Sequence, residues 1–330
     1  LLIIDNAYCQ IGGCDEFGND NTNELSHIVL EAVHRMKIPA SVCVRVHENI
    51  DKNFYYKAVK YLLTDRTGSP NFIGDKAMTE GFMKNGYSRK LAVSRVKCGC
   101  HWCAIPGKEY TLNDIVKINF VAVFDTAFKE MMNSGQEPSV ELLWDTFIKH
   151  INKAVAVTAE GMDFQIEHMH EVFPELLMDL LCEGPIEKGL DASNGGLEYI
   201  NLCVDGAGLA VVADSFAALE KRIEKNKQIT WDQIDKALKN DYKGYEDIQL
   251  MMKNSDHYGN GGTIADTYAE NIVKEFVAAV KKEPTPKGYN MIPGLFSWAN
   301  TIPMGKAVGA TPNGRLAYTP ISHGANPLPG

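Results

Sequence analysis

Stretches rich in β-forming residues alternate with stretches of helical periodicity along this chain, and that alternation limits its possible folds more than any other feature. Residues 41–47 combine small and apolar side chains as a strand does, and residues 53–64 place Phe54, Ala58 and Leu62 on one helical face. The same patterns predict strands at 71–73, 199–204 and 209–213 and helices at 77–85, 113–133, 140–157, 215–224, 231–239 and 263–282. Such alternation indicates a mostly parallel sheet covered by helices, either open or closed into a barrel.

The overall composition excludes several classes of protein. The 330 residues are 45% hydrophobic and 23% charged, as in a globular protein large enough for a substantial core. Because the chain has no run of about 18 apolar residues, we expect no membrane span and no membrane partner. A formal net charge of −9 argues against nucleic-acid binding, which needs a basic face. A chain of this length needs no disulfides for stability, so its eight cysteines suggest a reducing, cytoplasmic environment.

The most unusual segment spans residues 97–110. It holds three thiols, at Cys98, Cys100 and Cys103, and an imidazole at His101. Three interpretations fit these residues: a loop with incidental cysteines, a zinc or iron–sulfur knuckle, and a reactive thiol presented on a loop after a strand. Zinc knuckles normally use two Cys-x2-Cys arms, whereas this segment has only one.

Other segments rich in glycine and asparagine interrupt the chain, and none specifies a chemistry alone. Their separate interpretations are a helix-capping loop at 12–26, a helix N-terminus capped by Asp214 or Ser215, a loop at 258–262 and a turn at 309–315. The first lacks the Lys and Ser/Thr of a phosphate-binding P-loop, so the sequence does not indicate nucleotide binding.

Taken together and in order, these segments resemble the glycyl radical enzymes of the pyruvate formate-lyase-like superfamily over nearly the whole chain. The matching segments are Gly12 to Ser26, Val44-Arg45-Val46-His47, Gly68 to Asp75, Gly99-Cys100, Asp214 to Ala218, Tyr258-Gly259-Asn260 with Asp266, and Gly309 to Arg315. Gly74 replaces an Asn of the family pattern, and Asn313 replaces an Asp. Each segment is a weak signal alone, but seven in register make the resemblance specific.

The resemblance implies a ten-stranded α/β barrel, with residues 1–330 forming about its second half as a partial barrel domain. It also implies a finger loop with Cys100 at its tip. In the family this cysteine becomes a thiyl radical, by hydrogen transfer to a glycyl radical stored elsewhere in the protein, and then takes hydrogen from the substrate. We therefore expect a lyase that cleaves a C–C, C–O or C–N bond of a small metabolite. The implied partners are a radical SAM activating enzyme, which installs the glycyl radical, and a second copy in a homodimer, with no other bound cofactor or metal.

One departure from the family concerns the general base. Dehydratases and decarboxylases of the family carry Gly-Cys-x-Glu, and Trp102 occupies the position of that Glu. His101 and Glu109 are candidate replacements, and Asp205 lies where arylacetate decarboxylases carry a second catalytic carboxylate. Trp102 and Cys98 are candidate substrate contacts, with Trp102 suited to stacking on a flat substrate.

Two alternative functions remain open. A radical addition or acyl-transfer enzyme of the same family, of the formate acetyltransferase or succinate-adduct synthase type, also works without the Glu. A catalytically inactive barrel remnant acting as a partner subunit is favoured by the loss of the Glu and of the family's glycyl radical loop, and opposed by the retained Gly99-Cys100.

The second departure concerns the glycyl radical itself. The family's Arg-Val-x-Gly-Tyr/Phe loop does not occur in the printed sequence, which opens on Leu1-Leu2 and closes on Pro329-Gly330. The sequence therefore suggests a fragment of a longer enzyme. A half-barrel exposes strand edges and apolar interior, so we expect this chain to be insoluble alone.

Overall fold

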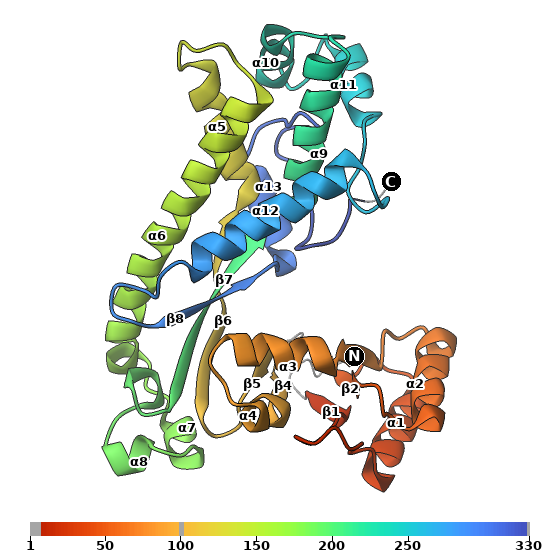
Figure 1. Ribbon diagram of the computed structural model, residues 1–330, viewed down its shortest axis with the longest axis vertical. Helices are drawn as coiled ribbons and strands as arrows, with labels where there is room; N and C mark the ends of the chain where they lie inside the picture. The colour runs from red at the N-terminus through yellow and green to blue at the C-terminus, as the bar shows by residue number, and fades with distance from the viewer. Residues whose placement is uncertain (1–7, 99–101, 329–330) are drawn as a thin grey trace. The chain divides into compact units, whose positions relative to one another are not determined.

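Three parallel strands organise the N-terminal part of the chain, as the strand–helix alternation predicts. In the computed structural model, which describes residues 8–98 and 102–328, β1 (Cys9–Gly12), β2 (Val42–Val46) and β3 (Asn71–Gly74) pair in that order (Figure 1). Helices α1 (Glu24–Met36) and α2 (Lys52–Asp65) connect them. Because β2 is the central strand, its residues are buried on both faces, and Val44 packs against Leu30 and Phe54 from the two helices.

The chain divides into two compact units. The first unit comprises residues 1–110 and 174–199, and the second comprises residues 111–173 and 200–330. Besides the parallel sheet, the first unit contains the following shorter elements: α3 (Asp75–Lys84), α4 (Arg89–Ser94), β4 (Val96–Cys98), β5 (Trp102–Ala104), α7 (Leu176–Leu181), α8 (Pro185–Lys188) and η1 (Ala192–Asn194).

The second unit is built around a second three-stranded sheet and a fully buried helix. Strands β6 (Glu109–Asn119), β7 (Tyr199–Ala207) and β8 (Asn290–Gly294) form the sheet, with β7 and β8 parallel. The remaining elements are α5 (Phe120–Met132), α6 (Val140–Val172), α9 (Leu209–Leu219), η2 (Glu220–Lys225), α10 (Trp231–Lys239), α11 (Glu246–Lys253), α12 (Ile264–Lys281), η3 (Trp298–Asn300) and α13 (Thr301–Lys306).

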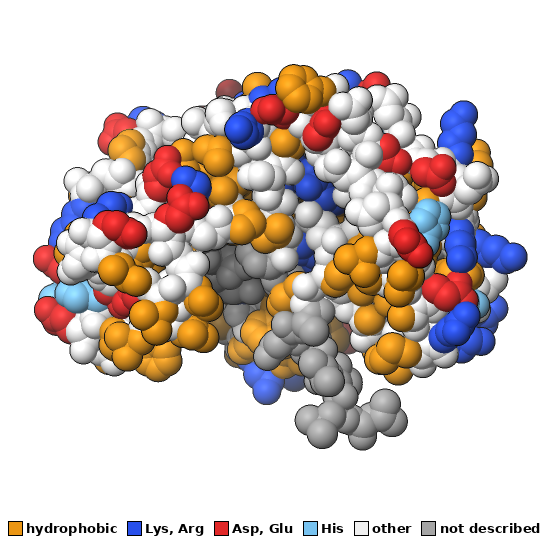
Figure 2. Space-filling model, turned by 90° about the horizontal axis from the view of Figure 1, so that it is seen from below, with side chains coloured by type: hydrophobic (Ala, Val, Ile, Leu, Met, Phe, Trp, Pro, Cys, Tyr) orange, Lys and Arg blue, Asp and Glu red, His pale blue; other side chains and the backbone are white. Residues whose placement is uncertain are grey.

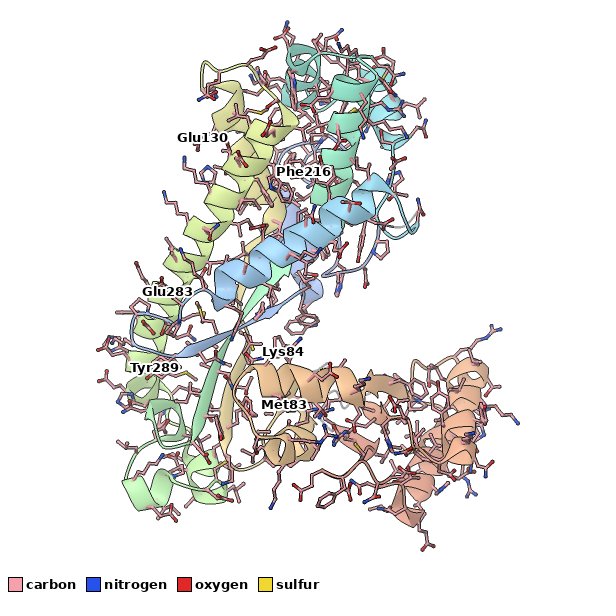
Figure 3. The ribbon with its side chains drawn as sticks, in the orientation of Figure 1. Met83, Lys84, Glu130, Phe216, Glu283 and Tyr289 are labelled. Atoms are coloured by element: carbon pink, nitrogen blue, oxygen red, sulfur yellow. The ribbon has the colours of Figure 1, made fainter. Side chains whose placement is uncertain are left out.

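Aromatic packing holds α9 at the centre of these helices. Phe216, on α9, has its ring centroid 5.1 Å from that of Phe124 on α5 and 5.4 Å from that of Trp144 on α6 (Figure 3). It also stacks on Tyr268 of α12 at 5.1 Å. Edge-to-face and stacked pairs of this kind each add about 0.5–1.5 kcal/mol beyond the burial of area.

Two predictions of local structure are wrong, and both fail at apolar runs. The helix expected at 113–133 begins as a strand, since β6 extends to Asn119, and only Phe120–Met132 is helical. The strand expected at 209–213 is the first part of α9, so Asp214 and Ser215 lie inside that helix and do not cap its start. A short run that is apolar on every side fits a buried strand and a buried helix equally well.

The fold class is mixed α/β. The described strands form a three-stranded sheet, a two-stranded sheet and a second three-stranded sheet. Across the described part of the chain, no helix is long and apolar enough to cross a membrane.

Some large apolar side chains of the first unit lie at the surface. Helix α7 exposes four leucines (Leu176, Leu177, Leu180 and Leu181), each by 67–74%, and the nearby Ile186 is 65% exposed. Figure 2 shows such hydrophobic side chains in several clusters on one face of the molecule. Exposed apolar clusters of this kind commonly mark surfaces that pack against another part of a protein or a partner.

The close packing at Gly206 provides a test of the second unit's core. A Cβ atom at Gly206 would overlap the ring of Phe120, whereas a Cβ atom at Gly161 of α6 would meet open space. We expect Gly206→Ala to lower the free energy of unfolding by about 1–3 kcal/mol, because overpacking forces side chains off their rotamers.

The matched control is Gly161→Ala, which should leave stability unchanged or raise it by about 0.5–1 kcal/mol through helix propensity. Urea denaturation followed by circular dichroism measures both variants. Equal stability of Gly206→Ala and wild type would contradict the packing described for β7.

Candidate functional site

The cysteine-rich segment forms a β-hairpin in the first unit. Strands β4 and β5 pair antiparallel, with Val96 opposite Ala104, Lys97 opposite Cys103 and Cys98 opposite Trp102. The three residues that join the two strands are 99–101, so the predicted Cys100 and His101 lie outside the described residues.

The two faces of this hairpin differ in burial. Residues directly opposite one another share a face, and Lys97 and Cys103 are 5% and 6% exposed. On the other face Val96 is exposed and Trp102 is half-buried. Burial raises the pKa of the Cys103 thiol, so at neutral pH Cys103 is a protonated core residue. One face of the hairpin is therefore packed into the interior of the first unit, and the other face carries Trp102.

A buried carboxylate, Asp75, anchors the base of the hairpin. Asp75 begins α3 directly after β3, and its Oδ1 accepts hydrogen bonds from Nε of Arg45 on β2 at 2.7 Å and from Nη2 of Arg95 at 2.5 Å. Its Oδ2 accepts from the backbone N–H of Cys14 at 3.1 Å. All three charged side chains are buried. One carboxylate thus joins the loop after β1, strand β2 and the residue that precedes β4.

The guanidinium groups determine the ionisation of this carboxylate. Burial alone would raise the pKa of Asp75, but the hydrogen bond from Arg45 and the charges of Arg45 and Arg95 more than offset that effect, and the pKa lies below its usual range. Arg95 also donates to the Ala92 carbonyl at 2.6 Å and to Thr79 Oγ1 at 2.9 Å. Asp75 is therefore ionised throughout the physiological pH range and holds both arginines in place.

Polar residues gather where the parallel strands end. Gly12, Val46 and Gly74 close β1, β2 and β3, and the residues that follow lead to a cavity of about 290 Å³ whose lining includes Cys14, His47, Asp75, Thr79 and Arg89. In open α/β sheets this carboxyl edge is a common place for ligands. His47 Nε2 lies 3.1 Å from Asp20 Oδ1, so the Arg-Val-His segment and the first glycine-rich segment contact each other here.

The two carboxylates proposed from the sequence have different surroundings. Glu109, which begins β6 in the first unit, is buried, and its Oε2 accepts the backbone N–H of Ile105 at 2.9 Å. This contact closes the turn after β5. Asp205 lies in the second unit on β7, opposite Gly294 of β8, and is 0% exposed.

In the second unit the motif segments of the sequence contact one another. Asp214 of α9 accepts from the backbone N–H of Tyr258 at 2.8 Å and lies 2.9 Å from His257 Nδ1. Ser215 Oγ accepts the backbone N–H of Asn313 at 3.3 Å. Arg315 donates to the Gly309 and Thr319 carbonyls, both at 2.7 Å. These contacts explain why the segments occur together: they fix the loops around α9.

Arg95 and Gln10 contribute to the site but were not predicted from the sequence; the Gln10 amide bonds the Arg95 carbonyl and the backbone N–H of Lys97. Arg95 stands alone in the run 91–96, and an isolated charge flanking an apolar run is the only sequence signal for it. Gln10, in the short strand β1, gives no such signal.

The chain is similar to known proteins over most of its length. The pyruvate formate lyase-like family matches residues 4–305. A (2S)-3-sulfopropanediol dehydratase of Klebsiella oxytoca is 26% identical over 96% of this chain and 40% of its own length. A trans-4-hydroxy-L-proline dehydratase of Clostridioides difficile is 27% identical over 99% of this chain and 43% of its own.

Solved structures agree with the sequence matches. The glycerol-bound form of the B12-independent glycerol dehydratase from Clostridium butyricum superposes with a TM-score of 0.89 at 25% identity, covering 96% of this chain and 42% of that one. The chain thus spans about two fifths of the length of the relatives it matches.

The Asp75 network provides a stability test with a defined pH dependence. We expect Asp75→Asn to lower the free energy of unfolding by about 3–5 kcal/mol at pH 7, because two buried guanidinium groups lose their counter-charge. A carboxyl whose folded pKa is depressed stabilises the fold above its unfolded pKa, and that contribution is lost as the pH falls through the folded pKa. Below about pH 4 the wild type should therefore lose stability more steeply than Asp75→Asn.

Glu80→Gln is the control, since Glu80 lies on the same helix, α3, and is exposed. It should change stability by less than about 0.5 kcal/mol. Denaturation at a series of pH values measures both effects. If the free energy of unfolding falls equally with pH in wild type and in Asp75→Asn, the charge of Asp75 does not stabilise this network.

Proposed function

Because the chain belongs to the pyruvate formate lyase-like family, we propose that it is the part of a glycyl radical enzyme that carries the thiyl-forming cysteine, Cys100. The proposed reaction is a lyase cleavage of a C–C, C–O or C–N bond in a small metabolite. The relatives named above include dehydratases of a sulfonated diol, of glycerol and of hydroxyproline, so small hydroxylated compounds are the first substrates to test.

The observation that carries the proposal is the hairpin. Gly99 and Cys100 fall in the three residues between two paired strands, and one side of that hairpin is fixed by Lys97 and Cys103. A cysteine that exchanges hydrogen atoms with two different partners needs a fixed position, because small displacements of reacting atoms are costly in rate. The docked strands on either side of residues 99–101 support the proposal that Cys100 has such a position.

The chemical step proposed for Cys100 is a pair of hydrogen-atom transfers. When a glycyl radical is present, the Cys100 thiol passes its hydrogen atom to that radical carbon, so the S–H bond breaks, a glycine C–H bond forms and the unpaired electron is left on sulfur. The resulting thiyl then takes a hydrogen atom from a substrate carbon, which re-forms the S–H bond and leaves the radical on the substrate. The role of the surrounding protein is to orient the substrate and exclude water from this exchange.

The general base for the following step is a separate proposal. Trp102 stands where the family's Glu would lie, so the base is one of His101, Glu109 and Asp205. Asp205 is favoured because it lies where arylacetate decarboxylases of the family carry a second catalytic carboxylate. Glu109 accepts the Ile105 N–H and so has a structural role as well. Trp102 and Cys98, opposite each other on the hairpin, are the proposed substrate contacts.

The proposal extends to the assembly. We propose that residues 1–330 form part of a ten-stranded barrel domain in a cytoplasmic homodimer, and that a radical SAM enzyme activates it. Because Trp102 replaces the family's Glu, a catalytically inactive partner subunit is the second candidate. Electron paramagnetic resonance of the full-length protein after anaerobic activation separates the two candidates, because an active enzyme forms an organic radical and an inactive remnant does not.

The role of Cys100 has a direct test. In the anaerobically activated full-length protein, Cys100→Ala should abolish turnover, because the proposal makes the Cys100 thiol the group that passes the hydrogen atom. The control is Cys182→Ala, which removes a half-buried thiol at the end of α7 and should leave the rate within about twofold of wild type. Chromatographic assay of product reports both, and turnover by Cys100→Ala would eliminate Cys100 as the thiyl site.

The role of Asp205 is tested by Asp205→Asn, which removes the carboxylate but preserves its shape. If Asp205 is the general base, kcat should fall by about 10²- to 10⁴-fold while the radical signal persists. A retained rate would remove Asp205 from the mechanism, and Glu109→Gln, assayed in parallel, then decides on Glu109.

A further inference from the structure

The side-chain amide of Gln10 joins the hairpin to the edge of the parallel sheet. Gln10 lies on β1, the edge strand, and its Nε2 donates to the Arg95 carbonyl at 3.2 Å. Its Oε1 accepts the backbone N–H of Lys97 at 3.1 Å. One amide therefore binds the backbone on both sides of Val96, in the way that a neighbouring strand would.

The side chain of Lys97 makes a second attachment from the buried face of the hairpin. Its ammonium donates to Ser41 Oγ and to Asn71 Oδ1, both at 3.3 Å, and lies 5.9 Å from the centre of the Tyr8 ring. Ser41 precedes β2 and Asn71 begins β3, so Lys97 reaches across the sheet to the start of two strands. A lysine only 5% exposed is rare, and its burial requires such partners.

The hairpin needs these attachments because it is very short. Each strand has three residues, and an isolated two-stranded hairpin is marginally stable at best in water. A slip of one residue would also turn Lys97 and Cys103 from the buried face to the other face. Gln10 and Lys97 both act on β4, so a shift of β4 along the sheet would break their contacts, and these contacts select the observed position of β4.

We propose that Gln10 and Lys97 are positioning residues, which hold strand β4 of the β4–β5 hairpin in one place against the parallel sheet, and that turnover at Cys100 depends on this attachment. The inference rests on the role proposed for Cys100, although the docking itself can be measured without turnover. Neither side chain has to touch the substrate, since each acts through the hairpin backbone.

The docking is tested by hydrogen–deuterium exchange of the backbone amides at 96, 97 and 102–104. Gln10→Met and Lys97→Met keep the side-chain length and remove the polar contacts. Each should raise exchange in the hairpin about tenfold or more, because two hydrogen bonds are lost, while exchange in β2 stays as in wild type. The control is Lys84→Met, at an exposed lysine on α3 (Figure 3), which should change neither region.

A conservative variant separates positioning from a general loss of stability. Lys97→Arg keeps a cation that can donate to Ser41 and Asn71, so it should restore most of the hairpin protection that Lys97→Met loses. Unchanged hairpin exchange in both methionine variants, or an equal rise in β2, would overturn the proposal. If Lys97→Met fails to fold, Gln10→Met and Lys97→Arg still give the comparison.

Turnover supplies the second readout. In the activated full-length protein, Gln10→Met should lower kcat about tenfold or more while the radical signal stays unchanged, because Cys100 and the proposed contacts Cys98 and Trp102 all lie on the loosened hairpin, whereas the glycyl radical is stored elsewhere in the protein. Hairpin loosening with wild-type kcat would refute the link to Cys100. If the wild type itself has no turnover while the exchange results hold, the proposed function fails and the docking role stands.

Discussion

One buried carboxylate holds together the part of the molecule on which the proposed chemistry depends. Asp75 is at the first turn of α3 and receives Arg45 from β2, Arg95 from the approach to β4 and the backbone of Cys14 after β1. Each arginine would be costly to bury alone, and the shared counter-charge makes both tolerable. The consequence is geometric: three segments far apart in sequence meet at one point, and the hairpin begins there.

From that point outward the hairpin is held in stages. Arg95, the residue before β4, is bonded to Asp75 and Thr79 of α3. Gln10 of β1 binds the backbone of β4, and Lys97 reaches Ser41 and Asn71 on the buried face. Lys97 and Cys103, one on each strand of the hairpin, are both buried, which supports the proposal that Cys100 is presented in a reproducible position.

The sequence predicted the parallel strands and most helices because their hydrophobic periodicity is strong, as in residues 41–47 and 140–157. It also supported the family through the order of motif segments, and the family match over residues 4–305 confirms that resemblance. It failed at 113–119 and 209–213, where tertiary burial decides between strand and helix. The hydrogen-bond network of the site could not be predicted for another reason. Arg95 contacts Asp75 and Gln10 only in the folded chain, and nothing in their local sequence marks them as partners. Cys100 and His101 lie outside the described residues, so their roles stay predictions.

The central claim is that Cys100 meets a substrate carbon at the tip of the docked hairpin. The most direct measurement is a crystal structure of the protein grown without oxygen in the presence of glycerol or a related small diol. The account predicts the Cys100 Sγ about 3–4 Å from a carbon of the bound diol, at the end of a hairpin whose strands keep the register of Lys97 with Cys103. A metal ion bound by Cys98, Cys100 and Cys103, or a diol bound away from the hairpin tip, would contradict it.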